Sequence, residues 1–245
     1  ISDDAEIVDA DLAGISELEI LKLSADAVDN AQSVTLASNA ASAGITTLDA
    51  ADVGADDNVS INAAGFANAL DVTTSSGDDV IVLGSGGSVV HAGDGANTVS
   101  VGALSDNITT GSGDDVIQVD NTVLGSALSI AAGGGADTLE VTSDADIDFA
   151  DVDNMSSIEV LKLSGNAADN AQLVFLGAAA DAMGLNTIDT TAVDGSDTVA
   201  LRLASMSNAL TMDTGAGSDD IVLGSGGSVV DSGNGNDAIT VGAAN

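Results

Sequence analysis

The sequence predicts an all-β solenoid, a fold in which short parallel strands stack as successive coils. Three observations point to this fold: a 140-residue repeat, a nine-residue repeat inside it, and a composition with 29 Gly and no Pro. Repeated units that cannot bury a core alone do so by stacking on their neighbours, so a solenoid is the natural product of such a sequence.

The long repeat relates the two halves of the chain. Residues 1–105 align with residues 141–245 at an offset of 140 without a gap, and 47 of the 105 positions are identical. The segment IVLGSGGSVV at 81–90 recurs unchanged at 221–230. We therefore expect a first unit over 1–140 and a second, incomplete unit over 141–245. Within them, we expect wider coils over 1–73 and 141–213 and nonapeptide coils over 74–140 and 214–245.

The short repeat gives the size of a coil. Residues 74–118 divide into five nine-residue steps, TSSGDDVIV, LGSGGSVVH, AGDGANTVS, VGALSDNIT and TGSGDDVIQ. Each step joins a turn of Gly, Ser, Asp and Asn to a short β-branched strand. Two steps then form one 18-residue coil with two strands and two turns, stacked on its neighbours at a spacing of about 4.8 Å.

The remaining residues of the unit also read as strands. We expect strands at 18–23, 33–37, 45–50, 58–63 and 70–74. The segment SNAASAG at 38–44 is open between a short helical turn that ends at Gly44 and a loop. The step from Asp115 to Asp137 is longer than the step from Asn97 to Asp115, which predicts a four-residue insertion near 121–126.

The charge of the chain restricts its partners. Thirty-nine acidic residues against three basic ones give a net charge of −36, and such self-repulsion opposes a compact state unless cations bind. Nucleic acid and anionic membranes are excluded as partners because both need basic patches. A mean hydropathy of +0.32 argues against a disordered acidic tail.

Other compositional features exclude further classes. The chain has no Cys, so it has neither disulfides nor thiolate metal sites. It contains no run of 18 apolar residues, which predicts no transmembrane segment, and no signal peptide is visible.

The nonapeptides resemble the repeats-in-toxin (RTX, haemolysin-type) family, whose signature is G-G-x-G-x-D-x-U-x, where U is a large apolar residue. In TGSGDDVIQ at 110–118, Gly111, Gly113, Asp115 and Ile117 occupy the second, fourth, sixth and eighth positions. Six copies agree in register, although the copy at 92–100 has Asn97 at the acidic position. The motif covers about 100 of the 245 residues.

This resemblance implies a right-handed parallel β-roll that binds several Ca²⁺ ions between turns on one edge. Sixth-position carboxylates and backbone carbonyls near the glycines would hold the ions, since Ca²⁺ takes six to eight oxygen ligands. The step from Asp57 to Asp79, like that from Asp197 to Asp219, is as long as the step from Asp115 to Asp137. These residues therefore extend the series backwards in both units. The metal-site residues expected on this basis are Asp57, Gly77, Asp79, Gly93, Gly95, Asn97, Gly111, Gly113, Asp115, Gly133, Gly135, Asp137, Asp197, Gly215, Gly217, Asp219, Gly233, Gly235 and Asp237.

The opposite edge departs from the signature, because Ser88 and Ser228 replace the acid, and we expect few or no ions there. The competing interpretation of the whole series is a metal-free β-helix with solvated turns. Stacked carboxylates without a counter-ion would repel one another, which argues against that interpretation.

A few single residues invite a catalytic interpretation that the repeat does not support. His91 aligns with Asp231, so we interpret it as a surface residue. We expect Lys22 to pair with Glu19, and Lys162 to pair with Glu159, in solvent.

Two further positions follow from the alignment. Phe66 aligns with Met206, which predicts core packing for both. Arg202 aligns with Asn62, so the fold does not require a cation there.

We expect no enzymatic activity, because every acidic pair lies in a repeated turn rather than in one singular constellation. The unit resembles those of bacterial S-layer proteins and giant RTX adhesins. This resemblance implies an extracellular, type I secreted protein that self-assembles, end to end or laterally, as an S-layer or filament. An adhesin stalk and the calcium-folded carrier module of a secreted enzyme are the alternatives, and cell-surface polysaccharide is a further candidate partner.

Overall fold

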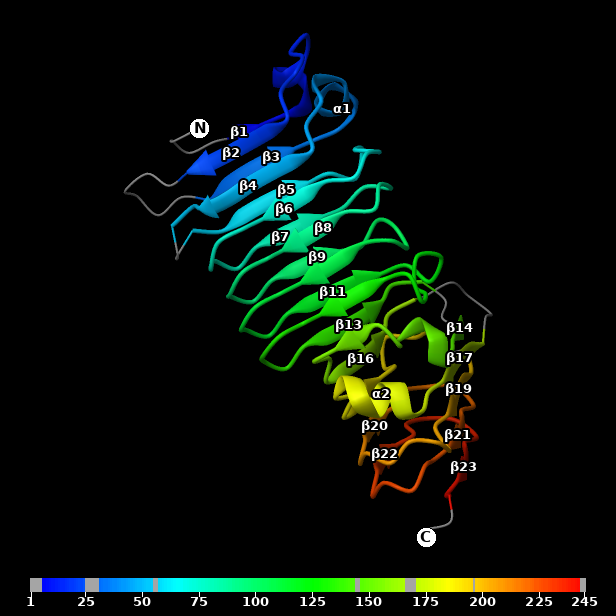
Figure 1. Cartoon of the computed structure of the whole chain (residues 1–245). Helices are drawn as coiled ribbons and strands as arrows, with labels where there is room; N and C mark the ends of the chain where they lie inside the picture. Colours follow the sequence, from blue (N-terminus) through cyan, green and yellow to red (C-terminus); the bar gives the residue numbers. More distant parts are fainter. Residues whose placement is uncertain are drawn as a thin grey trace. The chain divides into compact units, whose positions relative to one another are not determined.

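A computed structural model describes residues 6–24, 31–54, 57–143, 146–165, 171–195 and 197–242 (Figure 1). The chain forms two compact units, one of residues 1–117 and 127–135 and the other of residues 118–126 and 136–245. Both units consist mainly of short parallel strands. The repeat boundaries near residues 73, 140 and 213 stay sequence predictions.

The strands and helices have the following bounds: β1 (Glu6–Ile7), η1 (Asp9–Leu12), β2 (Ile20–Ser24), β3 (Gln32–Thr35), α1 (Ser38–Ala43), β4 (Thr47–Asp52), β5 (Val59–Asn62), β6 (Asp71–Thr73), β7 (Val80–Val82), β8 (Val89–His91), β9 (Thr98–Ser100), β10 (Asn107–Thr109), β11 (Val116–Val119), β12 (Ser129–Ala131), β13 (Thr138–Val141), β14 (Asp146–Ile147), η2 (Phe149–Asp151), β15 (Met155–Ser156), β16 (Val160–Leu163), β17 (Gln172–Phe175), α2 (Ala178–Met183), β18 (Thr187–Asp189), β19 (Val199–Arg202), β20 (Thr211–Asp213), β21 (Asp220–Val222), β22 (Val229–Asp231) and β23 (Ala238–Thr240).

The first unit is built from two parallel sheets that the chain visits alternately. One sheet has the order β1-β3-β5-β7-β9-β11, and the other has the order β2-β4-β6-β8-β10-β12. Consecutive strands therefore belong to different sheets, and each coil contributes one strand to each sheet. The predicted all-β parallel solenoid is confirmed at this level.

Strand register gives the length of each coil. Ile20 pairs with Thr47, Thr47 with Asp71 and Asp71 with Val89, so the coils become shorter along the chain. Val80 then pairs with Thr98 at the 18-residue step that the nonapeptides predict. The coils that precede the nonapeptides are therefore wider than the nonapeptide coils.

The core is made of stacked apolar residues at the central position of each short strand. On one sheet Ile61 pairs with Ile81 and Ile81 pairs with Val99, and all three are at most 1% exposed. Each row buries its side chains against the row of the other sheet. Small and β-branched residues suit this thin interior, and Phe66 fills it as predicted.

The second unit repeats the two-sheet arrangement. Its sheets have the orders β13-β16-β18-β20-β22 and β14-β17-β19-β21-β23. The strand pairs are parallel and in register, for example Leu201 with Ile221 and Ile221 with Ile239.

Two features left open or predicted at the sequence level have clear outcomes. The segment at 38–44 forms α1, which ends at Gly44 in the left-handed conformation (φ 98°), so the helical alternative is confirmed. The predicted insertion lies in the turn between β11 and β12, where Asn107 pairs with Ser129 at a 22-residue step. In the described part of the chain, no helix is both long and apolar enough to cross a membrane.

Candidate calcium-binding edge

The sixth-position residues of the first unit form a buried row at the start of alternate strands. We call Asp57, Asp79, Asn97 and Asp115 the first-unit ladder; they precede β5, β7, β9 and β11, respectively. All four are at most 7% exposed. The strand register thus places the predicted ladder at one edge of a single sheet, with its side chains inside the protein.

One side-chain oxygen of Asp79, Asn97 and Asp115 is used by the fold itself. Asp115 Oδ1 accepts a hydrogen bond from the Asn97 amide at 2.8 Å, and Asn97 Oδ1 accepts one from the Asp79 amide at 3.1 Å. Asp79 Oδ1 accepts one from the Val59 amide at 2.7 Å. These three side chains therefore each hold a backbone N–H of the preceding coil and fix the register between neighbouring coils.

The second oxygen of Asp79 has no such role. Among the described residues, Asp79 Oδ2 is buried and accepts no hydrogen bond. Burial raises the pKa of Asp79 to about 6, although the nearby Thr74 hydroxyl, which itself donates to the Ala92 carbonyl at 2.7 Å, and the bond from the Val59 amide act in the opposite direction. A buried carboxylate oxygen without a donor is costly, so this position calls for a proton or a bound cation.

The contacts of Asn97 indicate which groups surround the second side-chain atom at this ladder position. Its Nδ2 donates to the carbonyl of Gly95 at 3.1 Å and, at longer range, to the carbonyls of Gly93 (3.4 Å) and Asp94 (3.5 Å). Asp79 occupies the equivalent position one coil earlier, where a carboxylate oxygen replaces the amide donor. Since carbonyl and carboxylate oxygens repel one another, a cation is the natural partner for such a set of oxygens.

Asn97 itself presents its donor, not its oxygen, to these carbonyls. Its Oδ1 is used by the Asp79 amide. Its predicted role as a calcium ligand stays a prediction.

The glycines of these turns allow carbonyls of neighbouring coils to approach closely. Gly95 has φ 94°, and a Cβ at this residue would lie 2.4 Å from the Gly77 carbonyl oxygen. Gly113 has φ 134°, and its Cβ would lie 2.2 Å from the Gly95 carbonyl oxygen. Any other residue would be strained at both positions and would clash with backbone.

The other predicted glycines of the first unit lie in the same stack of turns. A Cβ on any of them would lie within 2.3 Å of a carbonyl oxygen in the neighbouring coil; they are Gly77, Gly93, Gly111, Gly133 and Gly135. Close stacking therefore explains why the turns need glycine whether or not an ion is bound.

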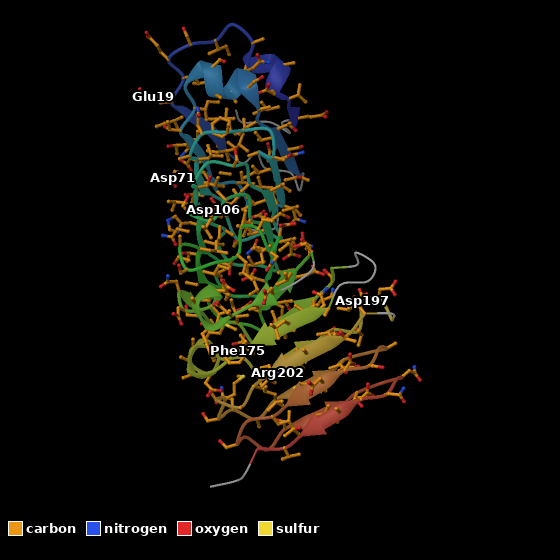
Figure 2. The ribbon with its side chains drawn as sticks, turned by 90° about the vertical axis from the view of Figure 1, so that its right-hand side faces the viewer. Glu19, Asp71, Asp106, Phe175, Asp197 and Arg202 are labelled. Atoms are coloured by element: carbon orange, nitrogen blue, oxygen red, sulfur yellow. The ribbon has the colours of Figure 1, made fainter. Side chains whose placement is uncertain are left out.

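The second unit has an equivalent row, Asp197, Asp219 and Asp237, before β19, β21 and β23; we call it the second-unit ladder (Figure 2 labels Asp197). Asp219 Oδ1 accepts a bond from the Val199 amide at 2.9 Å, and Asp237 Oδ1 accepts one from the Asp219 amide at 3.1 Å. Among the described residues, Asp219 Oδ2 is buried without a hydrogen bond. Asp219 and Asp237 thus hold backbone amides as the first-unit ladder does, although Asp237 is only half-buried.

A cavity of about 380 Å³ lies along these turns, and its lining residues are Gly195, Thr198, Ala216, Gly217, Ser218, Asn234 and Gly235. The predicted Gly215, Gly233 and Gly235 belong to the same turns and have positive φ angles. The cavity offers room for a hydrated ion beside the ladder.

Asp137 lies on the other sheet of the second unit, not with the second-unit ladder. It precedes β13, and its amide donates to Glu159 Oε2 at 2.9 Å, just before β16. Glu159 therefore holds the Asp137 amide as the ladder residues hold theirs. Sequence reasoning missed Glu159, although it follows Asp137 at the same step that joins Asp57 to Asp79.

The opposite edge of the first unit contains a buried carboxylate of a different kind. Asp106, which Figure 2 labels, is 0% exposed. Its Oδ1 accepts a bond from the Ser88 amide at 2.7 Å, and its Oδ2 accepts bonds from the Gly102 and Ala103 amides at 3.0 and 2.9 Å. Burial raises the pKa of Asp106, and the three amides lower it. Both oxygens are satisfied by N–H groups, so this carboxylate needs no cation.

Sequence reasoning also missed Asp106. The residue is the sixth of the nonapeptide VGALSDNIT and follows Ser88 at the 18-residue step, so the signal was present.

Among the described residues, no three His, Cys, Asp or Glu side chains come together in a way that would hold a metal ion. Each coil supplies at most one acidic side chain to a ladder, and the coil of Asn97 supplies none. A calcium ion at this edge would therefore take most of its oxygens from backbone carbonyls and water, as the glycine-rich turns permit.

The three other candidates have simple outcomes. His91 is exposed on β8, as predicted. Lys22 pairs with Asp49 at 2.9 Å and with Asp52 at 2.8 Å, so the expected pair with Glu19 is wrong. Residues three apart in a strand point to opposite faces, whereas Asp49 lies directly across from Lys22 on β4.

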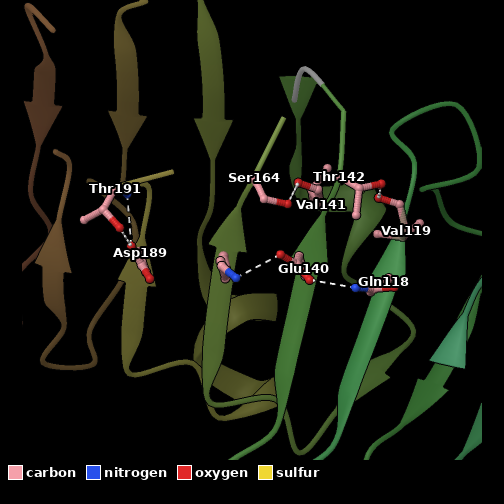
Figure 3. A network of polar contacts seen from close by, with 9 residues as sticks. Gln118, Val119, Glu140, Val141, Thr142, Ser164, Asp189 and Thr191 are labelled. Carbon is pink, nitrogen blue, oxygen red and sulfur yellow. Dashed lines mark hydrogen bonds and ion pairs between the residues drawn. The ribbon is translucent and has the colours of Figure 1, made fainter. Parts of the chain in front are cut away.

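The expected pair of Lys162 with Glu159 is wrong for the same reason. Lys162 pairs with its cross-strand neighbour Glu140 at 2.9 Å, and Gln118 Nε2 donates to the other oxygen of Glu140 at 3.0 Å (Figure 3). Burial alone would raise the pKa of Glu140, but the bonds from Lys162 and Gln118 lower it. This network lies on the outer face of its sheet.

No family model matches the chain, and searches of the curated proteins and of the solved structures also found no match.

Proposed function

We propose that the chain is a calcium-dependent structural protein of the bacterial cell surface that self-assembles as an S-layer or extracellular filament. The observation behind this proposal is the buried, undonated Oδ2 of Asp79 and Asp219, at positions where the equivalent Asn97 donates to turn carbonyls. Calcium at these positions would supply the missing positive partner.

The residues that would hold the ions are the ladder carboxylates with the carbonyls of their glycine-rich turns. In the first unit these are Asp57, Asp79 and Asp115, and in the second unit Asp197, Asp219 and Asp237. Asp137, which precedes β13, is a further ligand. Bound Ca²⁺ supplies positive charge and accepts oxygen ligands without strict geometry. Ions that bind only the folded chain stabilise it by mass action, which offsets the repulsion of a −36 net charge.

Repetition favours a structural role over catalysis. Carboxylates recur at the same position of successive coils, and Asp79, Asp115, Asp219 and Asp237 each hold a backbone amide of the neighbouring coil. An active site is usually one constellation of perturbed groups in a pocket. A ladder that holds several neighbouring coils in register instead favours a scaffold whose folding responds to calcium.

The extracellular location belongs to the same proposal. Millimolar calcium outside the cell would fill modest-affinity sites, whereas an exported chain would stay unfolded inside the cell. The resemblance to RTX proteins supports type I secretion. The alternatives, a giant-adhesin stalk and the carrier module of a secreted enzyme, share this calcium chemistry. They differ from the proposed function because the isolated chain would then not self-assemble.

Circular dichroism of the purified chain tests the calcium requirement. We expect β structure in millimolar CaCl₂ and its loss in excess EGTA, with MgCl₂ as the control because Mg²⁺ demands strict octahedral geometry. Identical spectra in calcium and in EGTA would contradict the proposal. Electron microscopy of the calcium-loaded chain then distinguishes lattices or filaments from single particles.

A further inference from the structure

One outer sheet face in the second unit differs in chemistry from its counterpart in the first unit. Phe149, Leu173, Phe175 and Arg202 gather there, on η2, β17 and β19; we call these four residues the aromatic face. Phe175 lies directly across from Arg202 in the strand register, and Figure 2 shows both on neighbouring strands. The rings of Phe149 and Phe175 make an edge-to-face contact with centroids 4.5 Å apart.

These side chains are exposed although most are apolar. Phe149 is 36% exposed, Leu173 38% and Phe175 42%, and the Arg202 side chain is 32% exposed. A contiguous exposed patch of this kind on a soluble protein commonly marks an interaction site.

The first unit shows that the fold does not require this patch. Its equivalent residues, 140 positions earlier, are Asp9, Ser33, Thr35 and Asn62. Asp9 there accepts bonds from the amides of α1, at 2.7 and 2.9 Å from Ala37 and Ala40. The same backbone position thus has a polar face in one unit and an aromatic face in the other.

A neighbouring glycine makes room for the aromatic pair. Gly177 stands where the first unit has Ala37. A Cβ at Gly177 would lie 2.5 Å from Cε1 of Phe149, so the ring fills the space that an Ala methyl would need. The two substitutions fit each other, which indicates that the ring has a fixed position on this face.

The composition of the whole chain makes this face exceptional. The chain has three Phe, and its three basic residues are Lys22, Lys162 and Arg202. Two of the three Phe and the single Arg belong to the aromatic face, while Phe66 is buried in the core. Aromatic residues and Arg are enriched in protein interfaces, and Asp and Glu are depleted there.

We propose that the aromatic face binds a second copy of this chain. Copies with a net charge of −36 repel one another over most of their surfaces, so association needs a face with apolar contacts and a cation. Arg202 Nη2 bonds Asp220 Oδ2 at 2.6 Å, and a guanidinium has five N–H donors, enough to reach a further carboxylate. Acidic side chains, of which each copy has 39, are the complementary group. The inference rests on the proposed self-assembly and names the face responsible.

The first unit supplies the test variant. Leu173→Ser, Phe175→Thr and Arg202→Asn together restore the residues that the first unit already folds with. Val80→Asp is the matched control, because Val80 is 46% exposed in the first unit and the second unit has Asp220 at the equivalent position. Sedimentation equilibrium in calcium should show wild type and control associating with rising concentration, and the triple variant weakened at least about tenfold.

The outcomes separate this inference from the proposed function. If wild type associates and the triple variant associates equally well, or the control weakens as much, the aromatic face is not the interface and self-assembly stands. A wild-type chain that stays at its 23.6 kDa monomer mass at every concentration overturns both the inference and the proposed self-assembly. Circular dichroism of each variant in calcium and EGTA reads the calcium requirement independently.

Discussion

Asp79 and Asp106 are both buried carboxylates on coil edges, and the same substitution should affect them in different ways. Asp79 has one undonated oxygen, whereas both oxygens of Asp106 accept backbone amides. We expect Asp79→Asn to remove a calcium ligand and to stabilise the metal-free fold. We expect Asp106→Asn to weaken the fold without changing calcium binding.

The magnitude for Asp79 follows from its burial. With a pKa raised from 3.8 to about 6, keeping this group ionised costs the metal-free fold about 3 kcal/mol at pH 7.5. An Asn at this position can donate to the Gly77 carbonyl, as Asn97 does to that of Gly95. Asp79→Asn should therefore stabilise the metal-free chain by about 1–3 kcal/mol. In calcium, Asp79→Asn should instead destabilise the fold, because a bound ion loses a charged ligand.

The magnitude for Asp106 comes from its amide partners. An Asn can keep the bond from the Ser88 amide, but its NH₂ group faces the N–H groups of Gly102 and Ala103. Leaving buried donors unpaired costs about 1–3 kcal/mol each. This cost is partly offset because the neutral Asn no longer buries a negative charge. We expect a destabilisation of about 2 kcal/mol that is equal with and without calcium.

Equilibrium dialysis for calcium stoichiometry and urea unfolding in CaCl₂ or EGTA at pH 7.5 measure both effects. Asp79→Asn should bind fewer ions than wild type, and Asp106→Asn should bind the same number. If Asp79→Asn keeps the full stoichiometry, or if both variants lose ions equally, the reasoning from the undonated oxygen is refuted.

Two further predictions concern the ladder. For the metal-free chain, the folded state binds more protons than the unfolded state between pH 3.8 and about 6, because burial raises the pKa of Asp79. The free energy of unfolding should therefore fall as pH rises through this window. A pH series of urea unfolding in EGTA measures it, and a rise in stability across the window would contradict the prediction. In calcium, Asp115→Ala should lower the number of bound ions and the melting temperature more than Asp57→Ala does, since Asp115 is fully buried and holds the Asn97 amide. His91→Ala is the control and should change neither quantity. Equal losses at residues 115 and 57 would count against an 18-residue calcium edge.

The sequence predicted the coil geometry well, because repeated spacing is a direct property of the chain. The 18-residue pairing of Val80 with Thr98 and the 22-residue pairing of Asn107 with Ser129 both follow from steps visible in the sequence. Stacking in register requires equal path lengths, so the spacing of turns dictates the spacing of strands. The wider coils lacked such a period, and their lengths came only from the strand pairing in the structure.

The environments of individual carboxylates were harder to predict. Spacing placed Asp79 on one edge, but it could not show that one of its oxygens holds the Val59 amide and the other has no donor. It also could not separate Asp79 from Asp106, which occupy the same nonapeptide position on opposite edges. That difference depends on which backbone amides the adjoining turns present, a property of three-dimensional turn geometry.

The two units show how a shared backbone can take on different chemistry at fixed positions. Asn97 of the first unit stands where the second unit has Asp237. The amide of Asn97 satisfies carbonyls of its own turn, so this coil reduces the stacked negative charge without an ion. The second unit keeps the acid at that position and places its exceptional residues on the outer face of a sheet instead. Because the inner rows fix the coil, substitutions at turn edges and outer faces can change ion binding and association while the fold is retained.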